Sequence, residues 1–485
     1  NVWVARRPDY KARKVTSYSG DDGQEITELT FTPDGNAIAY VRGGSASGRG
    51  EIPNPALDVE GETQAVWLVP LSGGAPRRVG EGHSPAIAGD RIAFVKGGEI
   101  WSASLRDTTA ATQLMHTRGH PSDLRWSPKG DKLAFTSDRG DHGFIGVYDA
   151  SLKSLRYLSP SVDEDNSPIW SPDGTRVAFI RIVTTSRRPS FGADRTEEPW
   201  SILVADASTG VGHEIWKAKP GVGSAYREIV ADAQLMWGQG DRIVFPWERD
   251  GWTHLYAVSA SGGDAALLTP GDFEVEHVSI TPDRATIFYS SNQGDIDRRH
   301  IWRVGVAGGK PAPVTSGAGL EWSPVQTSDG KAIAMLRSDA KVPARPAFVV
   351  GSAEPSDIAP ERIPGSFPSS ALVTPQQVVF PSADGMMLHG QLFLPPGGTK
   401  GERHPAVVFF HGGSRRQMLL GWHYMYYYSN AYALNQFLAS RGFEVLAVNY
   451  RSGIGYGLNF REALDYGATG GSEYNDVQGS GLFLR

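Results

Sequence analysis

The stretch WSPDGTRVAF (Trp170–Phe179) joins a polar turn sequence to a short apolar run. Nearly the same pattern occurs as FTPDGNAIAY (Phe31–Tyr40) and WSPKGDKLAF (Trp126–Phe135). Weaker copies occur at Ser84-Pro85, Trp237, Thr281-Pro282-Asp283 and Trp322-Ser323-Pro324. Because Pro, Asp and Gly favour tight turns between strands, each copy predicts a β-hairpin, and recurrence at roughly forty residues predicts a repeat architecture.

A second signal lies between the copies. Short strands that alternate aromatic and apolar residues are followed by paired glycines, as at Val66–Val69, Leu255–Val258 and Ile301–Val304. Each repeat then contains four strands, one into the turn, one out of it, one aromatic and one returning. Since a lone four-stranded sheet cannot bury both faces, we expect the repeats to pack face to face as the blades of a β-propeller.

The number of blades is seven or eight, and the pattern favours eight. Residues 1–18 supply two strands with no turn copy before them, which is what the outer half of an incomplete first blade would look like. Two insertions interrupt the repeat, a polar one at Thr184–Pro199 and a Gly- and Ser-rich one at Gly43–Pro55. We interpret the second as a mobile loop.

The pattern changes after Ala340. A Pro-, Ser- and Ala-rich stretch reaches Ser370 and predicts the last strands of the final blade and then a linker. Strands at Gln377–Pro381 and Leu388–Leu394 are joined by Asp384-Gly385, a hairpin signal.

Two continuous apolar runs, Ala406–Phe410 and Val445–Val448, predict central strands covered on both faces. The segment between them predicts a helix with a buried stripe of Ala431, Leu434, Phe437 and Leu438 that ends at Arg441-Gly442. A strand, a helix and a strand in this order predict a parallel crossover.

Composition limits the function. The chain has 485 residues, 40% of them hydrophobic and 21% charged, and a net charge of −6, so it belongs to the ordinary globular class. No basic excess favours a nucleic-acid partner. There is no cysteine, which excludes disulfides, thiolate metal sites and cysteine nucleophiles but does not distinguish cytoplasm from periplasm. No apolar run is long enough for a membrane span.

These motifs together resemble the prolyl oligopeptidase family of serine peptidases, near its dipeptidyl peptidase IV and acylaminoacyl peptidase branches. The resemblance rests on the turn repeats, on His411-Gly412-Gly413 after an apolar strand, and on NYRSGIGYG (Asn449–Gly457) after the next. It implies a β-propeller over residues 1–365 and the first part of an α/β-hydrolase domain over residues 371–485. It also implies a peptide substrate and no cofactor or metal, and leaves homo-oligomerisation open.

No Gly-x-Ser-x-Gly sequence occurs among the 485 residues. The resemblance implies a Ser-Asp-His triad, and a hydrolase presents its serine on that strained turn. We therefore expect the chain to be a fragment that ends before the nucleophile and is inactive alone. Because the chain begins with Asn1, we also expect a native N-terminus, and any signal peptide, to be missing.

Within the resemblance, a backbone N–H of the His-Gly-Gly turn would form part of an oxyanion hole, with Gly413 preferred over Gly412. The two glycines equally suit a tight turn that needs positive φ, and both readings can hold together. His411 is interpreted as a residue that stabilises this turn, since the family's catalytic base comes from near the C-terminus. For Arg451 the sequence offers a loop brace or a substrate contact.

For Glu197 and Glu198 the sequence leaves two roles open, a substrate contact or a solvated loop. Relatives in the dipeptidyl branch hold the free amino terminus of the substrate with paired glutamates, whereas a solvated loop beside Arg195 is the simpler reading. An aromatic group from His423 to Tyr428 predicts either packing or a pocket wall.

At the level of the whole protein, the alternative to a serine peptidase is a TolB-like propeller that binds a partner and carries a vestigial hydrolase segment.

Overall fold

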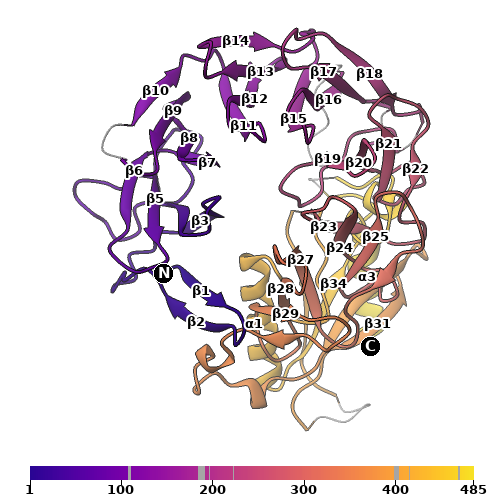
Figure 1. Cartoon of the computed structure of the whole chain (residues 1–485). Coiled ribbons are helices and arrows are strands. Elements are labelled where there is room, and N and C mark those ends of the chain that lie inside the picture. The colour runs from indigo at the N-terminus through magenta and orange to yellow at the C-terminus, as the bar shows by residue number, and fades with distance from the viewer. Residues whose placement is uncertain are drawn as a thin grey trace. The chain divides into compact units, whose positions relative to one another are not determined.

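The computed structural model describes residues 1–107, 111–183, 192–195, 197–221, 223–397, 403–413, 415–467 and 470–485. Strands predominate, and most of them form four-stranded antiparallel sheets in which each strand pairs with the next along the chain (Figure 1). The chain divides into two compact units, Asn1–Thr184 with Trp200–Lys217, and Thr185–Pro199 with Ala218–Arg485.

The first unit contains the hairpin β1–β2 and four blades. Their strands are β1 (Trp3–Arg6) and β2 (Lys11–Lys14); β3 (Ile26–Phe31), β4 (Ala37–Arg42), β5 (Ala65–Pro70) and β6 (Arg77–Glu81); β7 (His83–Ala88), β8 (Arg91–Lys96), β9 (Glu99–Ser104) and β10 (Thr112–Met115); β11 (His120–Trp126), β12 (Lys132–Asp138), β13 (Gly143–Asp149) and β14 (Ser154–Tyr157); β15 (Glu164–Trp170), β16 (Arg176–Ile182), β17 (Ser201–Asp206) and β18 (Gly212–Lys217). A single parallel pairing of Gly143 with Glu164 links the last two blades into one sheet.

The second unit begins with three more blades. Their strands are β19 (Met236–Gly238), β20 (Arg242–Trp247), β21 (His254–Ser259) and β22 (Ala266–Leu267); β23 (Val275–Ile280), β24 (Thr286–Ser291), β25 (His300–Gly305) and β26 (Ala312–Pro313); β27 (Leu320–Gln326), β28 (Ile333–Ser338), β29 (Arg345–Val349) and β30 (Ser356–Asp357). The described residues thus form seven four-stranded blades and the β1–β2 pair at residues 1–18. The predicted all-β, bladed architecture is confirmed.

Side-chain hydrogen bonds explain why the repeated turn needs its particular residues. The Ser171 hydroxyl donates to Asp173 over 2.6 Å and accepts the backbone N–H of Arg176 over 2.9 Å. Gly174 has φ +72°, a conformation that favours glycine. The hydroxyl of Ser171, followed by the backbone N–H of Thr175, lowers the pKa of Asp173 to about 2. The sequence Ser/Thr-Pro-Asp-Gly therefore closes the hairpin by its own side chains.

Two of the weaker turn copies are placed wrongly by the sequence. Trp322-Ser323-Pro324 lies inside β27, and the turn of that blade is formed by Thr327, whose hydroxyl donates to Asp329 over 2.7 Å. Ser84-Pro85 likewise lies inside β7. The mistake arises because Ser-Pro also occurs within the strand that precedes the turn.

The Ser-Pro pairs that were mistaken for turns lie at a β-bulge inside the first strand of the blade. The first strand of six blades shifts register there, and one non-glycine residue has positive φ. These residues are Glu28, Ser84, Asp123, Ser167, His277 and Ser323. Bulge residues of adjacent blades also make contact: Ser84 N donates to Glu28 over 2.6 Å, and Ser323 Oγ lies 3.1 Å from His277 Nδ1. The bulge is thus a repeated feature of the blade.

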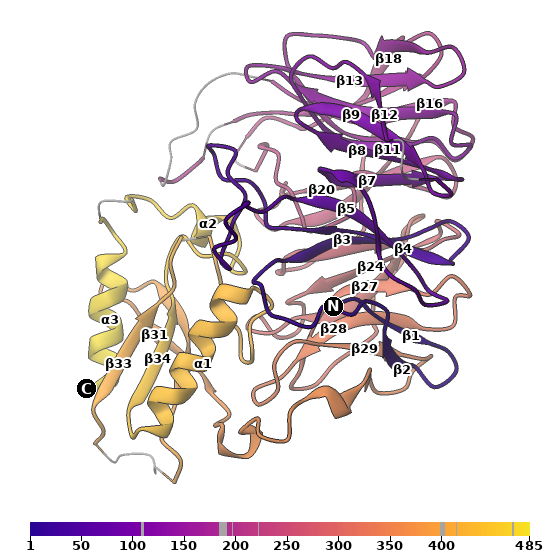
Figure 2. The same ribbon diagram turned by 90° about the vertical axis from the view of Figure 1, so that its left-hand side faces the viewer.

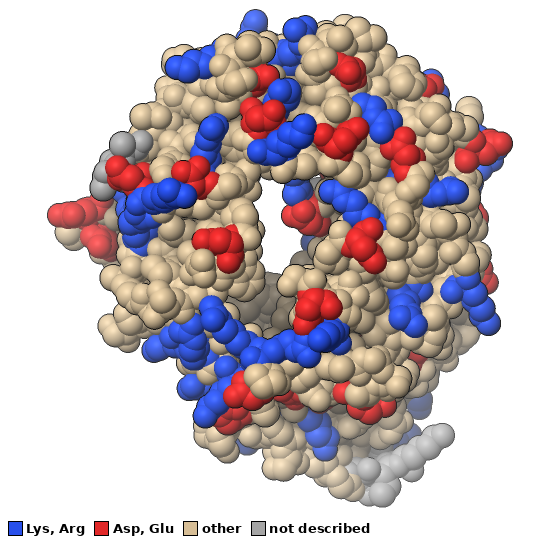
Figure 3. All heavy atoms as spheres, viewed as in Figure 1, with Lys and Arg blue, Asp and Glu red and all other residues tan. Residues whose placement is uncertain are grey.

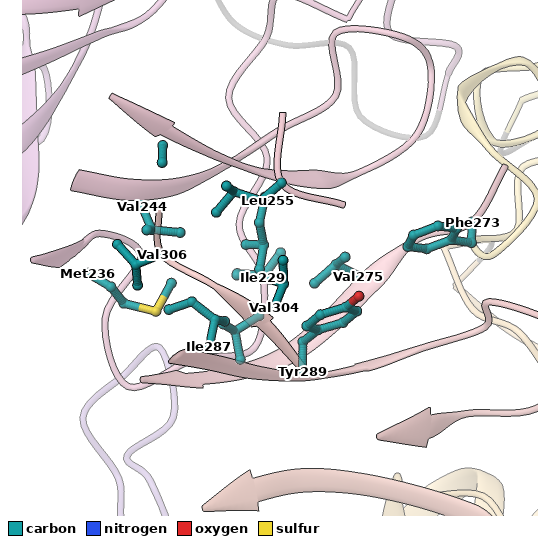
Figure 4. Close-up of a cluster of buried hydrophobic side chains, with 13 residues drawn as sticks. Ile229, Met236, Val244, Leu255, Phe273, Val275, Ile287, Tyr289, Val304 and Val306 are labelled. Carbon is teal, nitrogen blue, oxygen red and sulfur yellow. The ribbon is translucent and has the colours of Figure 1, made fainter. Parts of the chain in front are cut away.

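Adjacent blades within a unit pack through apolar side chains on their facing surfaces. Between β19–β22 and β23–β26, Leu255, Ile287, Tyr289 and Val304 are buried in one cluster (Figure 4). In the first unit, Phe94 and Phe135 belong to corresponding clusters between neighbouring blades. This packing buries the aromatic and β-branched residues that the alternation predicted.

The rest of the second unit is a mixed sheet with helices. Its elements are η1 (Pro360–Arg362), η2 (Ser369–Ala371), β31 (Gln376–Pro381), β32 (Met387–Phe393), β33 (Ala406–Phe410), α1 (Tyr426–Ser440), β34 (Glu444–Asn449), α2 (Leu458–Arg461) and α3 (Tyr474–Leu484). The strand order is β31-β32-β34-β33, with β33 and β34 parallel. The predicted hairpin and the predicted parallel crossover are confirmed.

Helices α1 and α3 lie on opposite sides of this sheet (Figure 2). Alternate residues of β34 point to opposite faces of the sheet. Val445 and Ala447 pack in one cluster with Tyr432 of α1. Leu446 and Val448 pack in another cluster, which includes Leu484 of α3. Strand β34 is therefore apolar on both faces, as a central strand requires.

The predicted buried stripe of α1 is only partly correct. Ala431 is buried and Leu438 is partly buried, but Leu434 and Phe437 are 51% and 58% exposed. The buried face instead carries Tyr428, Tyr432, Asn435, Gln436 and Ala439. Gln436 can be buried on this face because its side chain pairs with the backbone N–H and carbonyl of Val373, over 2.9 and 2.7 Å.

The surface carries charges of both signs. Lys and Arg are interspersed with Asp and Glu over the described residues of the face in Figure 3. No helix in the described part of the chain is long and apolar enough to cross a membrane. Of the predicted insertion at Thr184–Pro199, residues 184–191 and 196, with Arg187 and Arg188, lie outside the described residues.

Candidate functional site

The His411-Gly412-Gly413 turn follows the carboxyl end of β33, the strand that pairs in parallel with β34. Gly412 and Gly413 are exposed, and Gly413 has φ +66°, so a glycine suits the turn conformation. In the described part of the chain, neither glycine N–H donates a hydrogen bond to another residue. Within the described residues, both backbone donors of this exposed turn are thus unpaired.

Two tyrosine hydroxyls hold the turn from its carbonyl side. Tyr428, on the first turn of α1, donates to the Gly412 carbonyl over 2.7 Å. Tyr450, directly after β34, donates to the His411 carbonyl over 2.9 Å. The turn is therefore anchored to both elements that follow it in the chain.

His411 lies between these tyrosines and is itself buried. Its ring stacks on Tyr450 with 4.6 Å between centroids and meets Tyr428 edge-on at 6.3 Å. Burial lowers the pKa of His411 to about 4, so the imidazole is neutral at neutral pH. This environment agrees with a residue that stabilises the turn.

Arg451 is a brace within the sheet and its helices. Its guanidinium contacts Asp476 on α3 and Asp384 in the β31–β32 hairpin, over 2.7 Å in each case. The arginine side chain is 4% exposed, and Asp476 is fully buried. These contacts engage the guanidinium in ion pairs and favour the bracing role over the substrate contact that the sequence had also allowed.

The glycine-rich loop after Arg451 rests on a buried carboxylate. Glu274 accepts the backbone N–H groups of Gly455 and Gly457, over 3.0 and 3.2 Å. A Cβ at Gly455 would lie 2.0 Å from the Gln417 side-chain oxygen, and the φ of +94° also favours glycine there. Burial raises the pKa of Glu274.

Two further buried groups tie the loop region to the blades of the same unit. Asp297 accepts the Tyr456 hydroxyl over 2.5 Å and lies 2.8 Å from His389 Nδ1. Arg299 pairs with Glu276 and donates to Gln417 over 2.7 Å. These contacts hold the loop region against the blade formed by β23–β26.

Several arginines converge on one buried carboxylate near the turn. Glu462, 0% exposed, pairs with Arg415 over 2.6 Å, Arg227 over 2.7 Å and Arg461 over 3.0 Å. Its backbone carbonyl accepts Arg195 Nε over 2.8 Å. Despite burial, the backbone N–H of Asp194 and these arginines lower the pKa of Glu462, so it remains ionised.

Glu197 and Glu198 follow Arg195 in the chain and belong to the same compact unit as the His411-Gly412-Gly413 turn. Residues 192–195 contact the chain between residues 459 and 467, where Gly192 pairs with Gly467 and its carbonyl accepts the Tyr466 hydroxyl. Glu197 is exposed and Glu198 is partly buried.

Sequence reasoning found the turn but missed the residues that hold it. Tyr428 and Tyr450 were part of quoted motifs, yet no spacing rule predicts that their hydroxyls reach carbonyls 16 and 39 residues away. Of the aromatic group, Tyr428 is buried while Tyr426 and Tyr427 are 86% and 72% exposed. The described residues contain no group of three or more His, Asp or Glu side chains that could hold a metal ion.

The fold places this chain in the class of proteins in which the blades of a β-propeller are followed by a mixed sheet with helices. Comparison with known proteins agrees. The family described as "Dipeptidyl peptidase IV (DPP IV) N-terminal region" matches residues 192–344. A probable dipeptidyl peptidase 4 of Emericella nidulans is 26% identical over 274 residues, which cover 45% of this chain and 35% of that protein.

Solved structures share the fold at low identity. Porphyromonas gingivalis dipeptidyl peptidase 4 superposes with a TM-score of 0.67 at 14% identity, covering 90% of this chain and 66% of that one. Pyrococcus horikoshii acylaminoacyl peptidase gives 0.57 at 17% identity, covering 95% and 71%. The chain spans about a third (35%) of the length of the Emericella nidulans protein. The resemblance to the prolyl oligopeptidase family of peptidases is confirmed.

Proposed function

We propose that the protein carrying this chain is a serine-type peptidase that hydrolyses peptides through an acyl-enzyme. The observation that carries the proposal is the His-Gly-Gly turn at the end of β33, with the N–H groups of Gly412 and Gly413 exposed and unpaired among the described residues. The peptidase relatives and the shared fold support the same reaction class.

In the proposed reaction, a serine hydroxyl attacks the scissile carbonyl after losing its proton to a base. The negative charge that forms on the carbonyl oxygen accepts hydrogen bonds from the Gly413 N–H first and from the Gly412 N–H second. Collapse of this intermediate expels the amine, which takes the proton from the base. Water, deprotonated by the same base, then attacks the acyl group, and the serine leaves with that proton. This chain supplies the two N–H donors but no Gly-x-Ser-x-Gly turn, so we expect it to be inactive by itself.

The proposal divides the chain into a propeller over residues 1–365, which controls access of the substrate, and the first part of an α/β-hydrolase domain over residues 371–485. The position of the glycine turn supports the second assignment. The strand order β31-β32-β34-β33 places the turn at the end of a parallel strand, and ligand sites of such sheets lie beyond the carboxyl ends of parallel strands.

Glu197 and Glu198 are proposed to bind the free amino terminus of the peptide. The preceding residues support this role, because Arg195 and Asp194 contact Glu462 in the same unit that holds the turn. A carboxylate pair is the chemistry that recognises an ammonium group.

Expression of the whole protein tests the proposal. A peptidase should react with a fluorophosphonate probe and release p-nitroaniline from peptide anilides, whereas this chain alone should do neither. If the whole protein shows no labelling and no hydrolysis, the binding-module alternative replaces the peptidase.

A further inference from the structure

We propose that Tyr428 and Tyr450 are positioning residues that aim the N–H groups of Gly413 and Gly412 at the substrate. The inference rests on the proposed function of the His-Gly-Gly turn and adds the residues that control its orientation. Neither hydroxyl would touch the substrate. Each acts through a backbone carbonyl of the turn.

The geometry of the peptide unit connects the two contacts to the two donors. In a trans peptide the carbonyl and the following N–H share one plane and point in opposite directions. The described chain has its one cis peptide at Arg7-Pro8, so both peptides of the turn are trans. The carbonyl of Gly412 therefore fixes the direction of the Gly413 N–H, and the carbonyl of His411 fixes that of the Gly412 N–H.

Each of these carbonyls accepts one tyrosine hydroxyl. Tyr428 binds the Gly412 carbonyl over 2.7 Å, and Tyr450 binds the His411 carbonyl over 2.9 Å. Rotation of either peptide plane would break its hydrogen bond. The two hydroxyls thus hold the two N–H groups on the side of the turn away from the tyrosines, where they are unpaired within the described structure.

The tyrosines can serve as anchors because packing fixes their own rings. Tyr428 is 6% exposed and meets His423 edge-on at 5.5 Å. Tyr450 stacks on His411 at 4.6 Å and meets Phe410 edge-on at 5.9 Å. The hydroxyls of both rings are therefore carried on side chains with little freedom to move.

A direct role for either hydroxyl as an oxyanion donor does not fit this geometry. A tyrosine hydroxyl has one proton to donate. Tyr428 and Tyr450 each direct that proton to a carbonyl of the turn. Backbone N–H groups remain as the available donors.

The test is the hydroxyl deletion Tyr428→Phe, with Tyr450→Phe as a second variant, in the whole protein. Tyr432→Phe is the matched control. Tyr432 lies one turn further along α1, is fully buried, and donates to the Ala340 carbonyl over 2.8 Å, away from the turn. The control therefore loses the same kind of buried hydrogen bond without releasing a peptide plane of the turn.

We expect Tyr428→Phe to lower kcat by about tenfold with KM within about twofold, because a misdirected donor weakens binding of the transition state more than binding of the substrate. Tyr450→Phe should have the smaller effect of the same kind. Affinity for a peptide boronate, whose tetrahedral adduct places an oxygen in the oxyanion hole, should fall by the same factor as kcat. Tyr432→Phe should lower the Tm by a similar amount but leave kcat and boronate affinity unchanged.

The outcomes separate the two proposals. If the unmodified whole protein neither hydrolyses peptides nor reacts with a fluorophosphonate, the proposed function fails and this inference fails with it. If the unmodified protein is active and both tyrosine variants match Tyr432→Phe in kcat and boronate affinity, the positioning role is rejected while the peptidase stands.

Discussion

Arg451 and Asp476 form a buried ion pair, with 2.7 Å between Nη2 and Oδ1 and side chains that are 4% and 0% exposed. The pair connects the end of β34 to α3, and Asp384 extends it to the β31–β32 hairpin. Burial raises the pKa of Asp476, against the effect of hydrogen bonds from Arg451. The carboxylate thus depends on the arginine for its charge.

Replacing Arg451 by Ala should destabilise the chain strongly. The substitution leaves Asp476 buried without its partner, which costs about 3–5 kcal/mol. Urea denaturation would measure the change in the free energy of unfolding. The control is Arg78→Ala, since Arg78 and Glu81 are 41% and 48% exposed and such a pair contributes about 1 kcal/mol or less. Equal shifts for the two variants would contradict the bracing role.

The repeated β-bulge gives a prediction for the blades. Ser167 has φ +56°, where a β-branched side chain is strained, so Ser167→Val should destabilise the chain by about 1–3 kcal/mol. Ser167→Gly should change stability by less, because glycine adopts this conformation freely. Thermal denaturation would compare both with Ser154→Val on the exposed strand β14, where valine should be tolerated. A tolerated valine at position 167 would argue against the bulge.

His411 should make stability depend on pH. Its pKa falls from 6.5 to about 4 in the folded chain, so the unfolded state binds the proton more readily. Its contribution to stability is present above pH 6.5 and is lost as the pH falls toward 4. Between pH 7.5 and pH 5 the loss is about 2 kcal/mol.

His411→Phe keeps a ring between the tyrosines and removes the titration. The variant should therefore lose about 2 kcal/mol less than the unmodified chain between pH 7.5 and pH 5, as measured by urea denaturation at both pH values. His213→Phe, at an exposed position, is the control and should leave the pH dependence as it was. An unchanged pH dependence in His411→Phe would show that His411 is not held neutral by burial.

The glutamate proposal is tested in the whole protein with two substrates. Glu197→Ala or Glu198→Ala should raise KM for a dipeptide anilide with a free amino group and leave KM for its N-blocked analogue unchanged, because only the free ammonium group contacts the carboxylates. The exposed Glu354 supplies a control alanine variant. Equal loss on both substrates would end the proposal.

The blades were predictable because their signals are local. The Ser171 hydroxyl and the Asp173 carboxylate are two residues apart, and the turn they close can be read from five residues of sequence. The bulges were not predictable, because Glu28, Ser84 and His277 share a backbone conformation but no side-chain chemistry.

The sequence did not predict the buried face of α1 correctly, and it did not predict the tyrosines that anchor the turn. The reason differs from that for the bulges. Gln436 is buried because it meets the backbone of Val373, 63 residues earlier, and Tyr450 reaches the His411 carbonyl from a different strand. Such partners are set by tertiary packing, which periodicity along one helix does not record. The position of the glycine turn, by contrast, follows from the apolar strand before it.

The buried charges of the second unit determine how the molecule can be divided experimentally. Arg461 binds Glu248 through both terminal nitrogens, and Asp297 contacts His389, although the partners lie on opposite sides of the linker between residues 365 and 371. A fragment cut at that linker would expose one half of each pair, together with the apolar surface around it. The C-terminal sheet should therefore be expressed together with the last three blades, because these contacts join the segments on the two sides of the proposed linker.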